Sequence, residues 1–233
     1  MNLNRNKLGG QWYIDRLIAQ KKSINQMTSA WIYTNGHFTE AYPVAKGDKI
    51  EATSCLNEFC TDVGVPANLK SDRAGESVDR TSDFYKLARK KHINLTYAEP
   101  ERKNQIWPVD LEIRELKKRV KNKMRTKNAP ARTWDFCLVH QAKIPQLLSR
   151  TSLQGRTGYE EVTGQMPYIS EYLDFDFWDL VWYWPGTHPS INERGQLGRW
   201  AGVSHRIGSN VLLDNYGEWY SHCGDYSAIC DKR

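Results

Sequence analysis

The sequence lacks a long apolar run. Its most apolar stretch, FDFWDLVWYWP at residues 175–185, is interrupted by Asp176 and Asp179 and is too short to cross a membrane. The first residues do not have the pattern of a secretory signal peptide, so we expect a nuclear or cytoplasmic protein that is not secreted. Internal repeats and low-complexity linkers are also missing.

Cysteine is scarce and irregularly spaced. The odd number of cysteines predicts reduced thiols rather than a disulfide scaffold. The five are Cys55, Cys60, Cys137, Cys223 and Cys230. None of them forms, with histidine, the paired spacing of a structural zinc site. No histidine has the setting of a catalytic triad, so the sequence offers no nucleophile of the Ser-His or Cys-His kind.

Positive charge and aromatic residues are plentiful. Lys and Arg total 33 against 27 Asp and Glu, which gives a net charge of +6. Such an excess is compatible with a polyanionic partner, nucleic acid above all, but does not prove one. The 233 residues include nine Trp and twelve Tyr, enough for one substantial domain with a smaller appendage.

Hydrophobic periodicity predicts an α/β fold with a five-stranded mixed sheet flanked by helices. The predicted strands cover residues 11–15, 29–35, 37–45, 67–72 and 93–99. The predicted helices cover residues 48–63, 82–92 and 108–125, with a further one from Pro130 to Pro145. Asn35-Gly36 predicts a two-residue hairpin turn between the second and third strands. We expect this core to occupy residues 8–150.

Beyond residue 150 the sequence consists of short aromatic runs separated by Gly and Pro. The stretches DLVWYW, GRWAGVSH and NVLLDN predict a small β-rich extension over residues 151–233, with a frayed tail. The tryptophans at 178, 182, 184 and 200 are expected in the core of that extension rather than on a base-stacking platform.

Carboxylates stand at three points of the predicted sheet that can converge. Asp15 is expected to end the first strand and Asp72 the fourth, and another acid lies near the start of the long helix. Three oxygen donors around one cleft suit Mg²⁺ or Mn²⁺. Each acid alone also has an ordinary explanation, since Asp favours strand ends, turns and helix caps.

Four motifs in order resemble the integrase catalytic cores of retroelements, which are polynucleotidyl transferases of ribonuclease H-like fold with a D,D,E triad. They are QWYID with Asp15, LKSDRAGE with Asp72, NQIWPVDLEIRELKKR, and GRTGYEEVTGQMPYISEY beyond the core. The chain is most similar to integrases of long-terminal-repeat retrotransposons of the copia type, over residues 8–213. The 37 residues between Asp72 and Asp110 are similar to the spacing of the family.

The third acid departs from the family pattern. Where the relatives carry Ala-Glu, this chain has Val109-Asp110, and Glu112 follows two residues later. On a helix, one face is apolar: Val109, Ile113, Leu116 and Val120. The next face combines Asp110 with cations: Arg114, Lys117 and Lys121. Glu112 lies on the opposite flank, with Glu115 and Arg119.

A metal-binding acid that acts on DNA should share its face with cations. Asp110 meets this test and Glu112 does not, so we prefer Asp110 as the third ligand while Glu112 remains the alternative. In the family, basic residues one and two turns beyond the third acid contact DNA, and Arg114 and Lys117 occupy those positions. The shorter side chain of Asp110 is expected to impair metal geometry.

The resemblance implies metal-dependent cleavage and strand transfer of retroelement DNA into target DNA, with Asp15, Asp72 and Asp110 as metal ligands. It implies DNA binding by Arg114, Lys117, Lys121 and the loop residue Gln105, and a homo-oligomer when active. Three alternatives stay open. They are a catalytically decayed domain that only binds nucleic acid, a ribonuclease H-like nuclease acting on RNA–DNA hybrids, and a host protein that retains the fold as an interaction scaffold.

Overall fold

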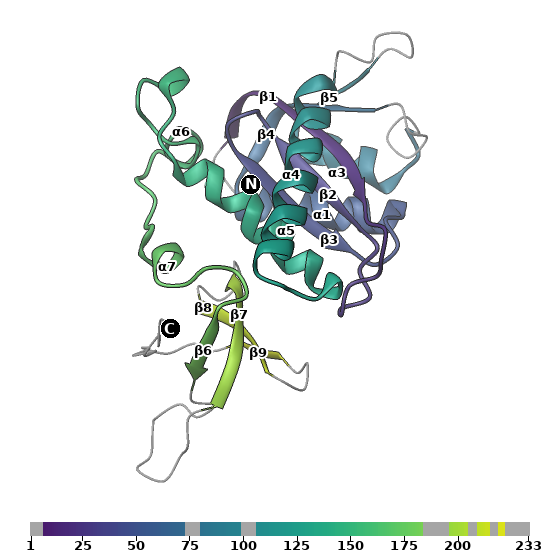
Figure 1. Ribbon diagram of the computed structural model, residues 1–233. Coiled ribbons are helices and arrows are strands. Elements are labelled where there is room, and N and C mark those ends of the chain that lie inside the picture. Colours follow the sequence, from purple (N-terminus) through teal and green to yellow (C-terminus); the bar gives the residue numbers. More distant parts are fainter. Residues whose placement is uncertain are drawn as a thin grey trace.

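The computed structural model describes residues 7–72, 80–98, 106–183, 196–204, 209–214 and 219–221. A five-stranded sheet forms the centre of the larger part, and a four-stranded sheet lies below it (Figure 1). The strands of the central sheet are β1 (Lys7–Ile18), β2 (Ser29–Thr34), β3 (Thr39–Val44), β4 (Val65–Ser71) and β5 (Asn94–Tyr97). The helices around it are α1 (Lys49–Asp62), α3 (Asp83–Lys90), α4 (Trp107–Thr126) and α5 (Trp134–Lys143).

The central sheet has the strand order β3-β2-β1-β4-β5. β2 runs antiparallel to both of its neighbours, β1 and β3, whereas β4 and β5 run parallel to β1. β2 and β3 are joined by a short hairpin loop, whereas the parallel pairs are joined by crossovers that include helices. The prediction of a five-stranded mixed sheet flanked by helices is confirmed.

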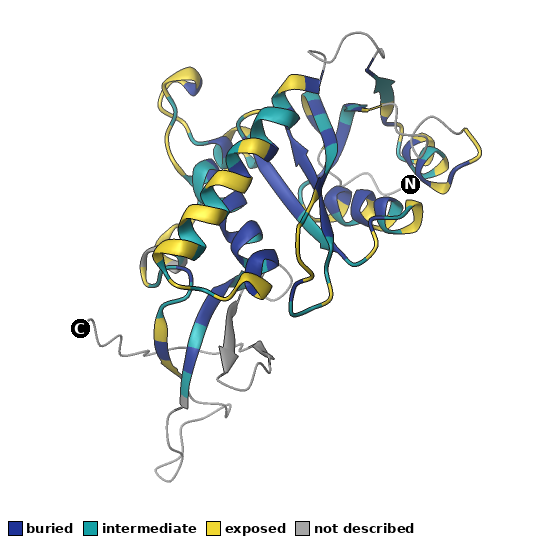
Figure 2. Ribbon diagram, turned by 45° about the vertical axis from the view of Figure 1, so that its right-hand side comes forward, coloured by how far each residue is buried: buried dark blue, intermediate teal, exposed yellow. Residues whose placement is uncertain are grey.

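Alternating side chains on the strands divide the core into two layers. On one face Trp12, Ile14 and Trp31 pack with residues of α1 and α3. On the other face Leu17 and Ile32 pack beneath α4 and α5. Because successive strand residues point to opposite faces, Asp15 lies on the α4 side of the sheet. Figure 2 shows the buried sheet covered by helices whose outer faces are exposed.

The predicted elements agree with the structure except at their ends and at one turn. The connection after β2 contains four residues, 35–38, rather than the predicted two. The Asn35 side chain accepts hydrogen bonds from the backbone N–H groups of His37 and Phe38, at 2.9 and 2.7 Å. Phe38 is buried in the core, so the chain must continue past Asn35-Gly36 before the third strand begins.

The second sheet contains β6 (Leu180–Tyr183), β7 (Gln196–Ser204), β8 (Ser209–Asp214) and β9 (Trp219–Ser221). It follows two short helices, α6 (Gly158–Thr163) and α7 (Ser170–Leu173). Trp200 is completely buried against Val181, as predicted. The prediction for Trp182 was wrong, because 41% of this residue is exposed on the outer side of β6. Residues 184 and 222–233 lie outside the described residues.

The second sheet is attached to the core through α4 and α5. The His140 ring on α5 meets the Trp200 ring edge to face, with 5.1 Å between ring centroids. Lys123 of α4 forms an ion pair with Asp176 at 2.9 Å, and Lys127 pairs with Asp179 at 2.6 Å. An aromatic contact and these ion pairs therefore hold the extension against the core.

Acid should weaken this attachment through His140. Burial lowers the pKa of His140 from 6.5 to about 4, with Asp176 raising and Lys123 lowering it. The stability that the neutral ring contributes is thus complete above pH 6.5 and is lost as the pH falls towards 4. At about 1.4 kcal/mol per pKa unit, the loss amounts to roughly 3 kcal/mol.

Urea unfolding at a series of pH values between 7.5 and 4 checks this expectation. His140→Gln should have a flatter pH dependence than the wild type, whatever its stability at pH 7.5. Parallel curves for the two proteins would show that another group controls the acid sensitivity.

No helix among the described residues is long and apolar enough to span a membrane. The three cysteines in these segments, Cys55, Cys60 and Cys137, are buried and are not joined in disulfides.

Candidate metal and nucleic-acid site

Asp15 lies inside β1, not at its end. The strand continues to Ile18 because β2 pairs with it from Tyr13 to Ile18, with Asp15 opposite Ile32. The prediction that Asp15 ends the first strand was therefore wrong. What ends beside Asp15 is the parallel neighbour β4, whose last residue, Ser71, pairs with Ile14.

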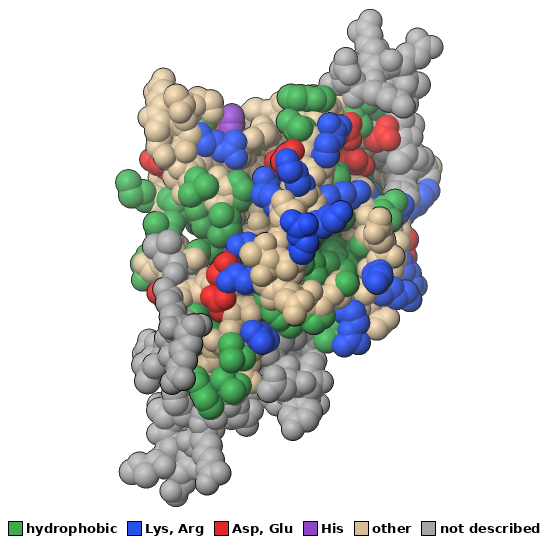
Figure 3. All heavy atoms as spheres, in the orientation of Figure 1, with side chains coloured by type: hydrophobic (Ala, Val, Ile, Leu, Met, Phe, Trp, Pro, Cys, Tyr) green, Lys and Arg blue, Asp and Glu red, His purple; other side chains and the backbone are tan. Residues whose placement is uncertain are grey.

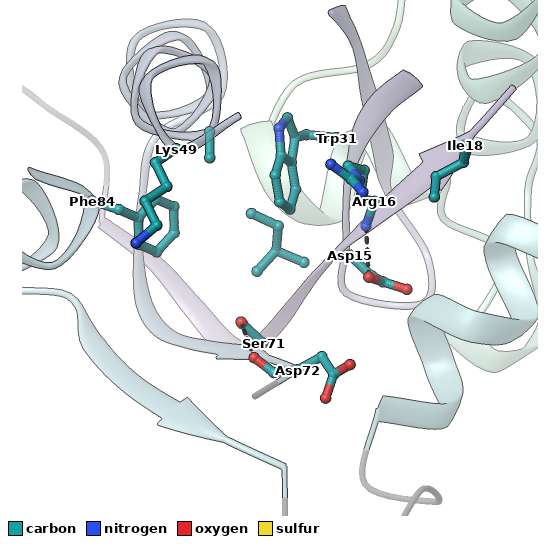
Figure 4. A pocket seen from close by; sticks show the side chains of 10 residues that line it. Asp15, Arg16, Ile18, Trp31, Lys49, Ser71, Asp72 and Phe84 are labelled. Carbon is teal, nitrogen blue, oxygen red and sulfur yellow. Dashed lines mark hydrogen bonds between the residues drawn. The ribbon is translucent and has the colours of Figure 1, made fainter. Parts of the chain in front are cut away.

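Asp72 comes directly after β4, as predicted. Since Ser71 pairs with Ile14, the next residues along the two parallel strands are Asp72 and Asp15. Neighbouring strands lie about 4.8 Å apart, and residues at matching positions point to the same face. Figure 4 shows both carboxylates projecting towards the side of the sheet on which a helix begins. The Asp72 carbonyl oxygen accepts a hydrogen bond from the Ser71 hydroxyl at 2.7 Å.

Asp110 belongs to the first turn of α4. Pro108 occupies one of the first helical positions, where its missing N–H costs nothing. Val109, Ile113 and Leu116 are buried and anchor the helix over the sheet, which confirms the predicted apolar stripe. Asp110 lies next to that stripe at the helix N-terminus, where the helix dipole favours a negative charge.

The three carboxylates influence one another electrostatically. Burial raises the pKa of Asp15 to about 6, against the effect of a 2.7 Å hydrogen bond from the Arg16 backbone N–H, and the charges of Asp110 and Asp72 raise it further. Burial and the Asp72 charge also raise the pKa of Asp110, whereas Arg114 lowers it. The fold therefore brings together Asp15, Asp72 and Asp110, although they are far apart in the sequence.

Glu112 points to a different neighbour. Its carboxylate forms an ion pair with Arg119 of the same helix at 2.5 Å, and both side chains are partly buried. The carboxylates whose charges raise the pKa values of Asp15 and Asp110 are those of the acid site itself, and not that of Glu112. Glu112 thus supports α4 internally, on the flank away from Asp110.

The predicted basic stripe is exposed along α4. Arg114, Lys117 and Lys121 all have solvent-exposed side chains. Figure 3 shows Lys and Arg side chains gathered over this helix. Lys123 of the same helix instead pairs with Asp176 and is not part of that surface. Gln105, the fourth residue expected to bind DNA, lies outside the described residues.

A pocket of about 220 Å³ opens beside Asp15 and Asp72. Its wall includes Trp31 and Phe84, together with Lys49 from the first turn of α1 (Figure 4). Sequence reasoning missed these residues. Nothing in the local pattern distinguishes them, because Trp31 and Phe84 have the spacing of ordinary core residues and Lys49 that of a surface residue.

The carboxylates do not form a compact metal cage. Within the described residues, no three His, Cys, Asp or Glu side chains are grouped closely enough to hold a metal ion. The donors are nevertheless of the kind that Mg²⁺ and Mn²⁺ prefer. Their mutual repulsion is also the kind of electrostatic cost that a divalent cation between them removes.

The strand order and the flanking helices define the class of fold, which is the ribonuclease H-like fold of integrase catalytic cores. The sequence itself matches no family model and no curated protein.

Two solved structures are similar to this chain in fold. The catalytic core domain of BIV integrase is 18% identical over 71% of this chain and 98% of its own, with a TM-score of 0.50. A chain of the simian T-cell lymphotropic virus intasome, in complex with the PP2A regulatory subunit B56 gamma, is 16% identical. That match covers 99% of this chain and 83% of the other, with a TM-score of 0.56. At these identities the likeness is one of fold.

Proposed function

We propose that this protein is an integrase-type polynucleotidyl transferase that cleaves retroelement DNA and transfers its end into target DNA. The observation that carries the proposal is the placement of Asp15 and Asp72 at matching positions of two parallel strands, with Asp110 in the facing first turn of α4. The charges of Asp72 and Asp110 both act on Asp15, and that of Asp72 also acts on Asp110. The integrase-type fold supports the assignment of the reaction class.

Asp15, Asp72 and Asp110 would hold Mg²⁺ or Mn²⁺. In such sites the cation activates a water or hydroxyl and stabilises the leaving oxygen of a phosphodiester. The residues of the chain provide negative charge at fixed positions for this purpose. Asp15 is held by the middle strand of the sheet, and its Oδ1 accepts the Arg16 N–H, so its orientation is set by the backbone.

The implied reaction has two steps. Water hydrolyses a phosphodiester near the 3′ end of the element, which releases a short 5′-phosphorylated fragment and leaves a 3′-hydroxyl. This hydroxyl then attacks a target phosphodiester in line, and the 3′-oxygen of the target strand leaves as the new P–O bond forms. No covalent bond to the protein forms. The exposed cations of α4 would hold the phosphates near the acids, through an electrostatic attraction that does not depend on the DNA sequence.

The decisive experiment is a strand-transfer assay with purified protein. The substrate is a labelled duplex with a recessed end, mixed with supercoiled plasmid in the presence of Mg²⁺, Mn²⁺ or EDTA. Joined product that requires the divalent cation supports the proposal. Cleavage of an RNA–DNA hybrid without any joined DNA would instead favour a ribonuclease H-like nuclease.

DNA binding by the basic stripe should depend strongly on salt. Replacing Arg114, Lys117 and Lys121 together by Glu should reduce the slope of log K against log salt concentration by about 2 to 3, since each lost phosphate contact removes about 0.9. Fluorescence anisotropy of a labelled duplex at several salt concentrations measures the slope.

A matched triple variant tests whether position matters. Replacing Lys86, Arg89 and Lys90 of α3 by Glu changes the net charge by the same amount. These three residues lie on the other side of the sheet from α4. Equal changes in slope for the two variants would assign the effect to net charge alone and remove the stripe from the proposed interface.

Two further parts of the proposal concern origin and assembly. We infer an origin in a long-terminal-repeat retrotransposon of the copia type from the four sequence motifs. We also infer that the active form is a homo-oligomer, because joining two DNA ends to one target requires more than one active site. The likeness to a chain of an intasome supports this expectation.

A further inference from the structure

A large groove lies between the second half of α4 and the connection that follows β1. Its volume is about 590 Å³, within the range of roughly 300–1,000 Å³ that is usual for ligand sites. We call it the α4 groove. Its floor is apolar and consists of Leu17, Val120, Met124, Trp134 and Leu138. Its rim carries four cations: Lys21, Lys117, Lys121 and Arg125.

The rim cations are available to a ligand. All four are exposed, and within the described segments no carboxylate forms an ion pair with any of them. Lys123 on the neighbouring face of α4 and Lys127 directly after its last residue behave differently, because Asp176 and Asp179 neutralise them. The helix therefore has one cationic face used internally and another that surrounds the groove without internal anions.

The groove adjoins the pocket beside Asp15. Ile18, with 58% of its surface exposed, lines both the pocket beside Asp15 and the α4 groove. Along α4, Lys121 is eleven residues from Asp110, which corresponds to about 16 Å at a rise of 1.5 Å per residue. A stacked strand advances about 3.4 Å per nucleotide, so the groove lies about five nucleotides from a phosphodiester at the acids.

We propose that the α4 groove binds an unpaired segment of single-stranded DNA, with a base on the apolar floor and its phosphates on the rim cations. The inference rests on the proposed function, since it assigns the groove to a strand that leaves the acid site. A duplex hides the faces of its bases, so it cannot use an apolar floor, whereas single strands bind through cationic grooves and apolar or aromatic contacts.

The test compares binding of a fluorescein-labelled hexathymidylate with binding of a labelled hairpin duplex. Both are measured by anisotropy in EDTA, so neither metal nor cleavage is needed. Met124→Glu places a carboxylate on the floor, and Lys21→Glu reverses a rim charge that lies outside the α4 helix. Lys118→Glu is the matched control, because Lys118 is an exposed cation of α4 that does not line the groove.

We expect Met124→Glu and Lys21→Glu each to weaken hexathymidylate binding about tenfold, and Lys118→Glu to weaken it at most about twofold. The affinity of Met124→Glu for the hairpin duplex should change at most about twofold. Equal losses in all three variants, or failure of the wild type to bind hexathymidylate, would overturn the proposal. So would tight binding of a labelled peptide of repeated Leu-Leu-Glu-Glu that hexathymidylate does not displace, since the groove would then be a protein-docking site.

The hexathymidylate binding test and the strand-transfer assay test the two proposals separately. Loss of the proposed function appears as absence of joined product in the wild type, whereas loss of the groove assignment appears in hexathymidylate affinity. A protein that binds hexathymidylate in the groove without joining DNA would retain the groove and lose the catalytic proposal.

Discussion

Asp15→Asn and Asp72→Asn should each abolish metal-dependent strand transfer. Either change removes an anionic donor while it keeps the side chain nearly the same shape. A metal ion contributes several kcal/mol of transition-state stabilisation, so losing its ligand is expected to lower the rate about a thousandfold or more. Initial rates of joined product at saturating Mg²⁺ and Mn²⁺ measure the effect.

Folding should not explain the loss. Burial already disfavours the Asp15 charge, so the neutral amide of Asp15→Asn is expected to fold at least as well as the wild type. Asp83→Asn provides a matched control, because Asp83 is an exposed acid of α3 in a surface ion pair with Lys86. Strand transfer that survives in both Asp15→Asn and Asp72→Asn would refute the assigned site.

Exchange of the third acid should produce effects of opposite sign. Asp110→Asn should abolish activity, whereas Asp110→Glu lengthens the side chain by one methylene and should restore the reach of the usual family residue. Because a misplacement near 1 Å can cost on the order of a hundredfold in rate, a gain of up to about that size is expected from Asp110→Glu. The same strand-transfer assay measures both variants.

Glu112→Gln is the matched comparison for Asp110→Asn. It breaks the pair with Arg119 and leaves the acid site intact, so its effect should appear in stability more than in strand transfer. Activity lost in Glu112→Gln and kept in Asp110→Asn would place the third acid two residues further along the helix. No activity in any variant, Asp110→Glu included, would favour a decayed domain that only binds nucleic acid.

Local pattern was sufficient to predict the elements that carry the site. The apolar spacing on the long helix predicted its buried face, and the separation of Asp110 from Glu112 by two residues placed them on different flanks. The strand predictions followed from β-branched and aromatic residues near Gly, Pro and Asn. Boundaries were less certain, as the four-residue turn that includes Phe38 demonstrates, because burial of that ring depends on residues far along the chain.

Tertiary structure alone decided what surrounds the acids. Asp15 lies within its strand because β2 continues to pair with β1 beyond the point at which β4 ends. The residues around Asp15 do not reveal how far a distant strand such as β2 extends. Likewise, the pairing of Lys123 with Asp176 separates it from the otherwise similar Lys121, since the acid comes from a segment more than fifty residues later. The types of the charged residues, and the faces on which they lie, follow from their order along the chain. Packing between distant segments determined which charges meet an opposite charge and which remain available for a ligand.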